Sequence, residues 1–208
     1  MSGVDLSGAH EAAHNTAHDA THNGGPGSET VSAWVRRFAP LMPGGEALDL
    51  ACGGGRHARH LAALGHAVVA VDRDPAALAA AAGPGIVTSQ IELEAADAAW
   101  PFGPGRFAGI VVTNYLHRPL LAGMVASLAP NGMLIYETFA DGNARFGKPS
   151  NPDFLLQPGE LLAWARDHEL RVIAYEDGVL DTPKAAMVQR ICAVKAEFPR
   201  EAALLPSF

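Results

Sequence analysis

Residues 47–57 read Ala47-Leu48-Asp49-Leu50-Ala51-Cys52-Gly53-Gly54-Gly55-Arg56-His57, and this stretch decides the fold. Its apolar start predicts a buried strand over 47–51, and three glycines follow shortly after it. Glycine permits a sharp turn with positive φ and lets a ligand approach the main chain. A helix is predicted over 56–64, and the first N–H groups of a helix lack partners within it. The stretch therefore predicts a strand, a glycine turn and a helix that together hold a ligand.

Short apolar runs alternate with helical stretches on both sides of this turn. Before it, Ser28 is predicted to cap a helix that reaches Phe38. After it, we predict strands over 67–71, 87–93, 110–113, 133–138, 171–175 and 187–194, and helices over 75–82, 119–128 and 159–168. Such alternation predicts an α/β fold with a doubly wound, mostly parallel, seven-stranded, Rossmann-like sheet. The last two strands are joined by a turn without a helix, which predicts an antiparallel strand at one edge.

The composition excludes several classes of protein. The chain has 208 residues, of which 49% are hydrophobic and 18% charged, with a formal net charge of −7. This is globular composition, and its acidic balance argues against general binding to nucleic acid or acidic membranes. No apolar run approaches the ~18 residues of a membrane span, and no signal peptide is recognisable. Two cysteines provide neither a disulfide framework nor zinc-site spacing, so we expect a cytoplasmic protein.

The first 28 residues differ from the rest, because they contain almost no bulky apolar side chains. We predict a disordered His-rich tail over 1–28 and one domain over 29–208. His10, His14, His18 and His22 recur every four residues, which would place neighbouring imidazoles on one face of a helix. Incidental histidines in a polar tail are the simpler interpretation, so no metal site is predicted.

Two classes of cofactor fit the glycine turn. Gly53 and Gly55 match the dinucleotide fingerprint with Ala58 in its third position, and Asp72, at the end of the next strand, could hold the ribose hydroxyls. S-adenosylmethionine (SAM) fits the same features. Asp49 favours SAM, since a carboxylate there can receive an amino group but would repel a pyrophosphate. The closing strand pair, the lack of a Tyr-x-x-x-Lys pair and the short chain also favour SAM. An NAD(P)-dependent oxidoreductase and a non-catalytic SAM- or nucleotide-binding module remain the alternatives.

The region from Val31 to Lys195 resembles the class I SAM-dependent methyltransferase family. Residues 49–55 resemble its first motif, with Ala51 in place of the first glycine, and residues 71–75 resemble its second. Short tellurite-resistance-type methyltransferases are the most similar subgroup in size and in the first motif. The resemblance implies a site for SAM, with S-adenosylhomocysteine as product, and Asp72 on the ribose hydroxyls. The cofactor-binding residues predicted in and directly after these motifs are Asp49, Ala51, Cys52, Gly53, Gly55, Arg56, Asp72 and Arg73.

A third motif of the family contacts adenine. Glu92-Leu93 aligns with its frequent Asp-Leu pair, and Asp97 is a competing choice nearby. We therefore add Glu92 and Leu93 to the predicted cofactor site. Asn114 completes it, because it stands where members of the family often contact SAM.

Chemistry is expected beyond the carboxyl ends of the strands over 110–113 and 133–138, where open α/β sheets bind ligands. His117 is the candidate base, because imidazole titrates near neutral pH; the alternative is that it caps or packs at the start of the next helix. Tyr115 and Tyr136 are predicted to shape the catalytic pocket, since an aromatic face can favour a sulfonium. Glu137 is either a base or a structural acid. The long segment 139–158 is either a lid or a packed surface loop.

We expect direct methyl displacement onto a small molecule, such as a thiol or a chalcogen oxyanion. This expectation of the acceptor follows from the subgroup resemblance and from the lack of a basic surface. No nucleic acid or membrane partner is expected, and the protein is predicted to be a monomer or a homodimer.

Overall fold

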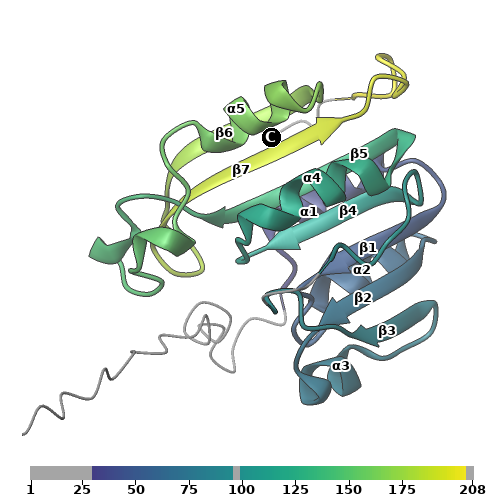
Figure 1. Cartoon of the computed structure of the whole chain (residues 1–208), viewed down its shortest axis with the longest axis horizontal. Coiled ribbons are helices and arrows are strands. Elements are labelled where there is room, and N and C mark those ends of the chain that lie inside the picture. The colour runs from purple at the N-terminus through teal and green to yellow at the C-terminus, as the bar shows by residue number, and fades with distance from the viewer. Residues whose placement is uncertain (1–29, 96–98, 205–208) are drawn as a thin grey trace, which may run out of the picture.

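The computed structural model describes residues 30–95 and 99–204, and within them seven strands form one sheet (Figure 1). The strands are β1 (Glu46–Leu50), β2 (Ala67–Asp72), β3 (Ile86–Gln90), β4 (Phe107–Thr113), β5 (Leu128–Phe139), β6 (Arg171–Leu180) and β7 (Ala186–Val194). The α-helices are α1 (Ala33–Phe38), α2 (Arg56–Ala63), α3 (Pro75–Ala81), α4 (Leu121–Ser127) and α5 (Glu160–Asp167). Short 3₁₀ turns are η2 (Ala39–Leu41), η3 (Arg118–Leu120), η4 (Asn143–Arg145) and η5 (Pro152–Phe154).

The sheet runs in the order β3-β2-β1-β4-β5-β7-β6. Neighbours from β3 to β5 are parallel, whereas β7 pairs antiparallel with both β5 and β6. The predicted doubly wound α/β fold is confirmed, as is an antiparallel pairing at one edge. The strand that runs against the others is β7, which enters between β5 and the edge strand β6. The strand order reverses direction between β1 and β4, the point where such sheets bind ligands.

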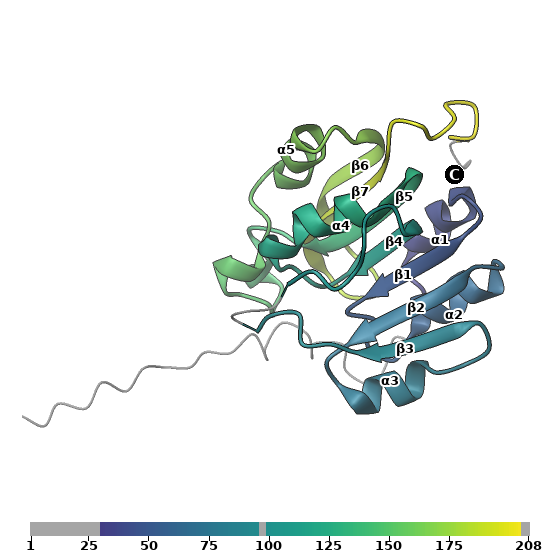
Figure 2. The ribbon, with the colours of Figure 1, turned by 45° about the vertical axis from the view of Figure 1, so that its right-hand side comes forward.

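Helices cover both faces of the sheet (Figure 2), and an apolar cluster is buried under each layer of helices. Helices α1, α2 and α3 pack on one face, and their largest fully buried residues are Trp34, Phe38 and Leu61. Helices α4 and α5 pack on the other face, where Met124 and Trp164 meet the sheet. Both faces of the central strands are thus buried, which explains why β4 reads as a continuous apolar run.

Several element boundaries differ from the sequence prediction. The first helix begins at Ala33, because Ser32 is its cap: the Ser32 Oγ accepts hydrogen bonds from the N–H groups of Trp34 (3.1 Å) and Val35 (3.5 Å). The third strand ends at Gln90, so the predicted adenine residues Glu92 and Leu93 lie in the following loop.

Strand β4 starts earlier than predicted, at Phe107, and includes Gly109. A Cβ at Gly109 would meet the Met42 side chain at 2.1–2.6 Å, so this glycine serves close packing and does not mark a turn. The predicted tail (1–28) and Asp97 lie outside the described residues. Within the described ranges, no helix has the length and apolar character required to cross a membrane.

Candidate cofactor and acceptor sites

The glycine turn after β1 adopts left-handed backbone at three positions: Ala51 (φ 53°), Gly53 (φ 51°) and Gly55 (φ 75°). A Cβ at Gly55 would lie 2.5 Å from the Cβ of Ala81, so only glycine lets α3 pack this closely. A Cβ at Gly53 would meet nothing within 4 Å. The main chain at Gly53 is therefore open to a ligand, whereas Gly55 is closed by packing.

Asp72 ends β2 beside this turn, and two backbone groups fix its carboxylate. Its Oδ2 accepts a hydrogen bond from Gly53 N–H (2.8 Å), and its Oδ1 accepts one from Asp74 N–H (3.0 Å). Each carboxylate oxygen retains a lone pair, so a pair of vicinal hydroxyls can still donate to it. This is the geometry that a ribose-binding acid needs.

Asp49 lies almost completely buried in β1, under the start of α2. Its Oδ2 accepts a hydrogen bond from Ala58 N–H (2.8 Å). Burial raises the pKa of this carboxyl to about 8, against the lowering effects of that hydrogen bond and of Arg56, while Asp72 raises it further. A cation bound nearby would favour the charged form, so Asp49 is suited to respond to a positively charged ligand.

A cleft opens beside Asp72, and it brings several of the predicted cofactor residues together. Its lining residues are Ala51, Asp72, Arg73, Ile91, Glu92, Leu93, Glu94 and Tyr115. Arg73 and Glu92 lie 3.9 Å apart as an ion pair within it. The sequence analysis missed Ile91 and Glu94, although both flank the motif it used. Tyr115, predicted for catalysis, lies here among the residues predicted for adenine.

Three further residues predicted for the cofactor site differ in burial and in contacts: Arg56, Cys52 and Asn114. Arg56 is half-buried, and burial lowers its pKa while Glu137 and Asp49 act in the opposite direction. The Cys52 thiol is buried and its pKa is raised by burial, so it is an inert packing group. Asn114 is exposed after β4 with φ 55°, and its N–H donates to the Glu137 carbonyl (2.9 Å).

The three residues predicted for catalysis do not converge on one point. Tyr136 is fully buried on the face covered by α4 and α5, where its hydroxyl donates to the Tyr115 carbonyl (2.8 Å). Tyr136 therefore supports the backbone of Tyr115 from within the core. His117 is half-buried in the turn that begins η3, where its carbonyl accepts a hydrogen bond from Leu120 N–H (3.1 Å).

Four polar side chains form a row across four neighbouring strands, which we call the polar row: Thr113 (β4), Glu137 (β5), Arg190 (β7) and Glu176 (β6). Each is the register partner of the next. Arg190 contacts Glu137 (Nη1 to Oε2, 3.3 Å) and donates to Glu176 (Nε to Oε2, 2.8 Å). The Arg190 guanidinium also stacks 4.8 Å from the Trp34 ring. The row lies at the carboxyl ends of β4 and β5, next to Asn114.

Ser32 and His57 are connected to the polar row by hydrogen bonds. The Ser32 Oγ donates to Glu137 Oε1 (2.9 Å), and the Ser32 N–H donates to His57 Nε2 (3.2 Å). Since Nε2 accepts, the His57 Nδ1 carries the proton and faces the Thr113 Oγ1 at 3.3 Å. Burial, with Arg56 and His60, lowers the pKa of His57 to about 3, so this histidine is neutral. The sequence analysis did not find this network, because its members are far apart in the chain.

The long segment 139–158 is anchored at several points. Arg118 Nε and Nη2 donate to the Glu160 carboxylate (2.6 and 2.9 Å), and Nη2 also donates to the Leu155 carbonyl (2.9 Å). Asn143 is buried, and its Oδ1 accepts a hydrogen bond from Met187 N–H (3.1 Å). Of the two alternatives left open by the sequence, these contacts favour a packed loop.

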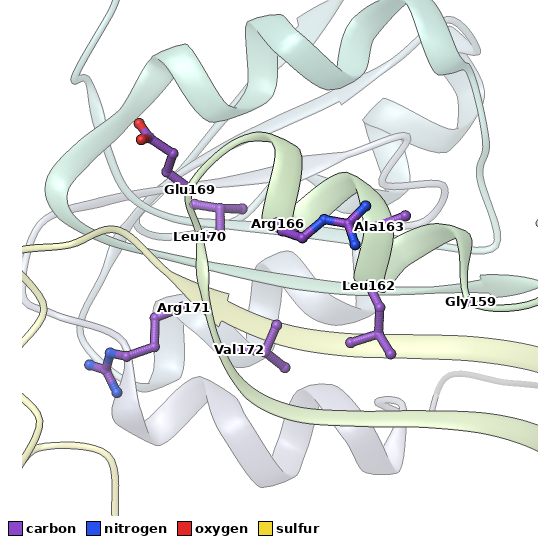
Figure 3. A pocket seen from close by; sticks show the side chains of 8 residues that line it. All are labelled: Gly159, Leu162, Ala163, Arg166, Glu169, Leu170, Arg171 and Val172. Carbon is purple, nitrogen blue, oxygen red and sulfur yellow. The ribbon is translucent and has the colours of Figure 1, made fainter.

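A separate groove of about 730 Å³ lies between α5 and β6 (Figure 3). Strand β6 forms the opposite edge of the sheet from β3. Its walls carry the partly exposed Leu162 and Val172, with Arg166 and Arg171 beside them. The cofactor candidates lie at or near the carboxyl ends of β1, β2, β3 and β4, so this groove is no part of their site. Among the described residues, no group of three or more His, Cys, Asp or Glu side chains is placed to hold a metal ion.

The comparisons of the fold and of the sequence with known proteins agree. Solved structures of SAM-dependent methyltransferases share the fold of this chain. Residues 47–132 match a family model described as a methyltransferase domain, and this stretch of the chain is a methyltransferase domain. The predicted fold is confirmed, and residues 47–132 match the predicted family.

Solved structures with this fold cover most of the chain at low identity. TehB from Haemophilus influenzae is 18% identical with a TM-score of 0.66; the alignment covers 79% of this chain and 62% of TehB. The 1,6-didemethyltoxoflavin-N1-methyltransferase of Burkholderia thailandensis, solved with S-adenosylhomocysteine, is 21% identical (TM-score 0.58; 82% and 79% covered). The geranyl diphosphate C-methyltransferase of Streptomyces coelicolor is 15% identical (TM-score 0.58; 78% and 79% covered). No curated protein sequence matches the chain significantly.

Proposed function

We propose that this protein transfers a methyl group from SAM to a small-molecule acceptor by direct displacement, with a catalytic domain over 29–208. The observation that carries the proposal is the Asp72 carboxylate, which two backbone N–H groups fix at the end of β2 beside the open main chain of Gly53. The match to a methyltransferase domain and the toxoflavin and geranyl diphosphate enzymes, which act on small molecules, support it.

The residues present fit SAM as the methyl donor. Asp72 would hold the ribose hydroxyls, and Asp49, with Arg56 beside it, would face the charged methionyl end. The cleft residues Glu92, Leu93 and Tyr115 would surround the adenine. SAM supplies an electrophilic methyl group on a sulfonium, and the protein needs to orient the acceptor and exclude water. The ends of β4 and β5 are largely buried, which supports the exclusion of water there.

Two further parts of the proposal concern the location of the protein in the cell and the roles of His117 and Tyr136. Cys52 and Cys192 are both free thiols, as expected for a cytoplasmic protein, and we propose that location. We also propose that His117 acts in the acceptor pocket, at the end of β4, and that Tyr136 acts only by supporting Tyr115.

Calorimetric titration with S-adenosylhomocysteine, and in parallel with NADH and NADPH, tests the proposal. We expect micromolar binding of S-adenosylhomocysteine alone, and a loss of at least ~100-fold in Asp72→Ala, because two charge-assisted hydrogen bonds are removed. Asp74→Ala is the matched control: it removes a carboxylate two residues away that caps α3, so it should lower stability by ~1 kcal/mol and leave binding intact. Binding of a nicotinamide nucleotide alone, or unchanged affinity in Asp72→Ala, would overturn the proposal.

A further inference from the structure

If the proposed function is correct, the methyl acceptor binds near the carboxyl ends of β4 and β5, where Glu137 lies. Glu137 lies at the carboxyl end of β5, its carbonyl accepts a hydrogen bond from Asn114 N–H, and Arg56 acts on its charge from the cofactor side. A carboxylate that is 8% exposed is costly to bury, even when it is paired. Packing against α1 does not by itself require a charged side chain at position 137. Ile135, two residues earlier in β5 and on the same face of the sheet, is apolar.

We propose that Glu137 binds the methyl acceptor, accepting a hydrogen bond from a neutral hydroxyl or amine and taking up its proton. Each carboxylate oxygen has one donor in the polar network: Ser32 Oγ on Oε1 and Arg190 Nη1 on Oε2. Each oxygen can accept a second hydrogen bond, and the side chain retains 11% exposure through which an acceptor can reach it.

The charge of the surroundings defines the class of acceptor. In the network around Glu137, Arg190 and Arg37 face Glu137 and Glu176, so two positive charges balance two negative ones. Arg56 interacts electrostatically with both Glu137 and Asp49. The Glu137 carboxylate would repel an anionic nucleophile directly. A hydroxyl or amine is instead oriented by the carboxylate that it donates to.

The reaction step balances with Glu137 as proton acceptor. A lone pair of the acceptor oxygen or nitrogen forms the bond to the methyl carbon, and the bond from that carbon to the sulfonium sulfur breaks with its electron pair on sulfur. The proton of the acceptor passes to a Glu137 oxygen and then to water. Ser32 is a positioning residue, because its hydroxyl fixes the Glu137 rotamer while its own N–H is held by His57.

The test compares Glu137→Gln with the parent protein in two measurements. The first is S-adenosylhomocysteine binding, which should not change. The second is transfer from methyl-labelled SAM into a protein-free bacterial metabolite extract, which should fall by at least ~100-fold, the range of a lost acid–base group. Glu46→Gln is the control, because Glu46 is ion-paired with Arg106 at the other end of the strands (2.7 Å) and should leave transfer unchanged. Mass spectrometry of the labelled product should identify an O-methyl or N-methyl compound.

Each outcome supports or overturns the inference. Equal transfer by Glu137→Gln and the parent would overturn the role of Glu137 and leave the proposed function standing, and an S-methyl product would overturn the acceptor class. Binding without any transfer by the parent would overturn the proposed function and the inference with it. Glu137→Asp guards against a folding defect: if it binds S-adenosylhomocysteine normally and retains part of the transfer activity that Glu137→Gln loses, the carboxylate itself is required.

Discussion

The two halves of the sheet hold their buried acids in different ways. On the cofactor side, Asp49 and Asp72 accept hydrogen bonds from backbone N–H groups that are 2 to 19 residues away in the chain. On the acceptor side, Glu137 is held by the side chains of Arg190 and Ser32, which are 53 and 105 residues away. A backbone N–H donor is retained when its residue is substituted by any residue except proline. A side-chain donor is lost when that one residue is substituted. The cofactor side is therefore fixed by local geometry and the acceptor side by the identity of distant residues.

The largest expected effect comes from breaking the backbone geometry of the cofactor side. Gly55→Ala would place a Cβ 2.5 Å from that of Ala81, at a positive φ. We expect a loss of about 3–5 kcal/mol, from overpacking and left-handed strain together, and a loss of S-adenosylhomocysteine binding. Thermal unfolding and calorimetry measure both. At Gly54 the nearest atom to a new Cβ is 4.0 Å away, so Gly54→Ala should unfold at nearly the same temperature as the parent protein. An equal loss of stability in both variants would contradict the packing explanation.

An intermediate effect is expected from the acceptor side. Arg190→Met removes the partner of Glu137 but retains apolar contact with Trp34. We expect a loss of about 2–3 kcal/mol, because a nearly buried carboxylate is left unpaired. Denaturant titration checks the stability, and S-adenosylhomocysteine affinity should stay unchanged, since the cofactor side is held by its own backbone. The exposed pair partner Arg106 gives the control, Arg106→Met, with a loss below ~1 kcal/mol. A large fall in affinity in Arg190→Met would show that the two halves are not independent.

The smallest expected effect is a pH dependence of the cofactor side. The native pKa of Asp49 is about 8, whereas the unfolded value is about 4, so the native state binds more protons between these values. Stability from this group is therefore greatest below pH ~4 and falls as pH rises to 8. Asn cannot ionise, so the stability of Asp49→Asn relative to the parent should increase by up to ~1.4 kcal/mol between pH 6 and pH 7. Denaturant titration at the two pH values measures the change, and parallel pH profiles would contradict it.

The contrast between local and distant contacts also explains which parts of the fold and site could be predicted from the sequence. The glycine turn, Asp49 and Asp72 could be predicted, because a strand, its turn and the following acid lie within one short stretch. The sheet followed from the alternation of apolar runs and helices. The boundaries failed where packing overrides local pattern: Gly109 lies inside β4 to accommodate Met42, and Ser32 caps α1 because it also bonds Glu137 and His57.

The polar row could not be predicted from one sequence. Thr113, Glu137, Arg190 and Glu176 become neighbours only through strand register, and β7 enters the sheet beside β5 although β6 precedes it in the chain. For the same reason the orientation of Tyr136 was not foreseen. In a strand buried on both faces, alternate apolar residues do not reveal which side faces the core of α4 and α5.

The insertion of β7 has a consequence for the chain while it is being synthesised. Strands β4 and β5 both leave the ribosome before β7, so the edge of β5 that pairs with β7 has no partner until the last of the described strands is synthesised. An open, apolar strand edge is a template for pairing with another chain. The nascent protein therefore passes through a stage in which chaperone capture or aggregation competes with completion of the sheet, and truncation before Ala186 should trap it there.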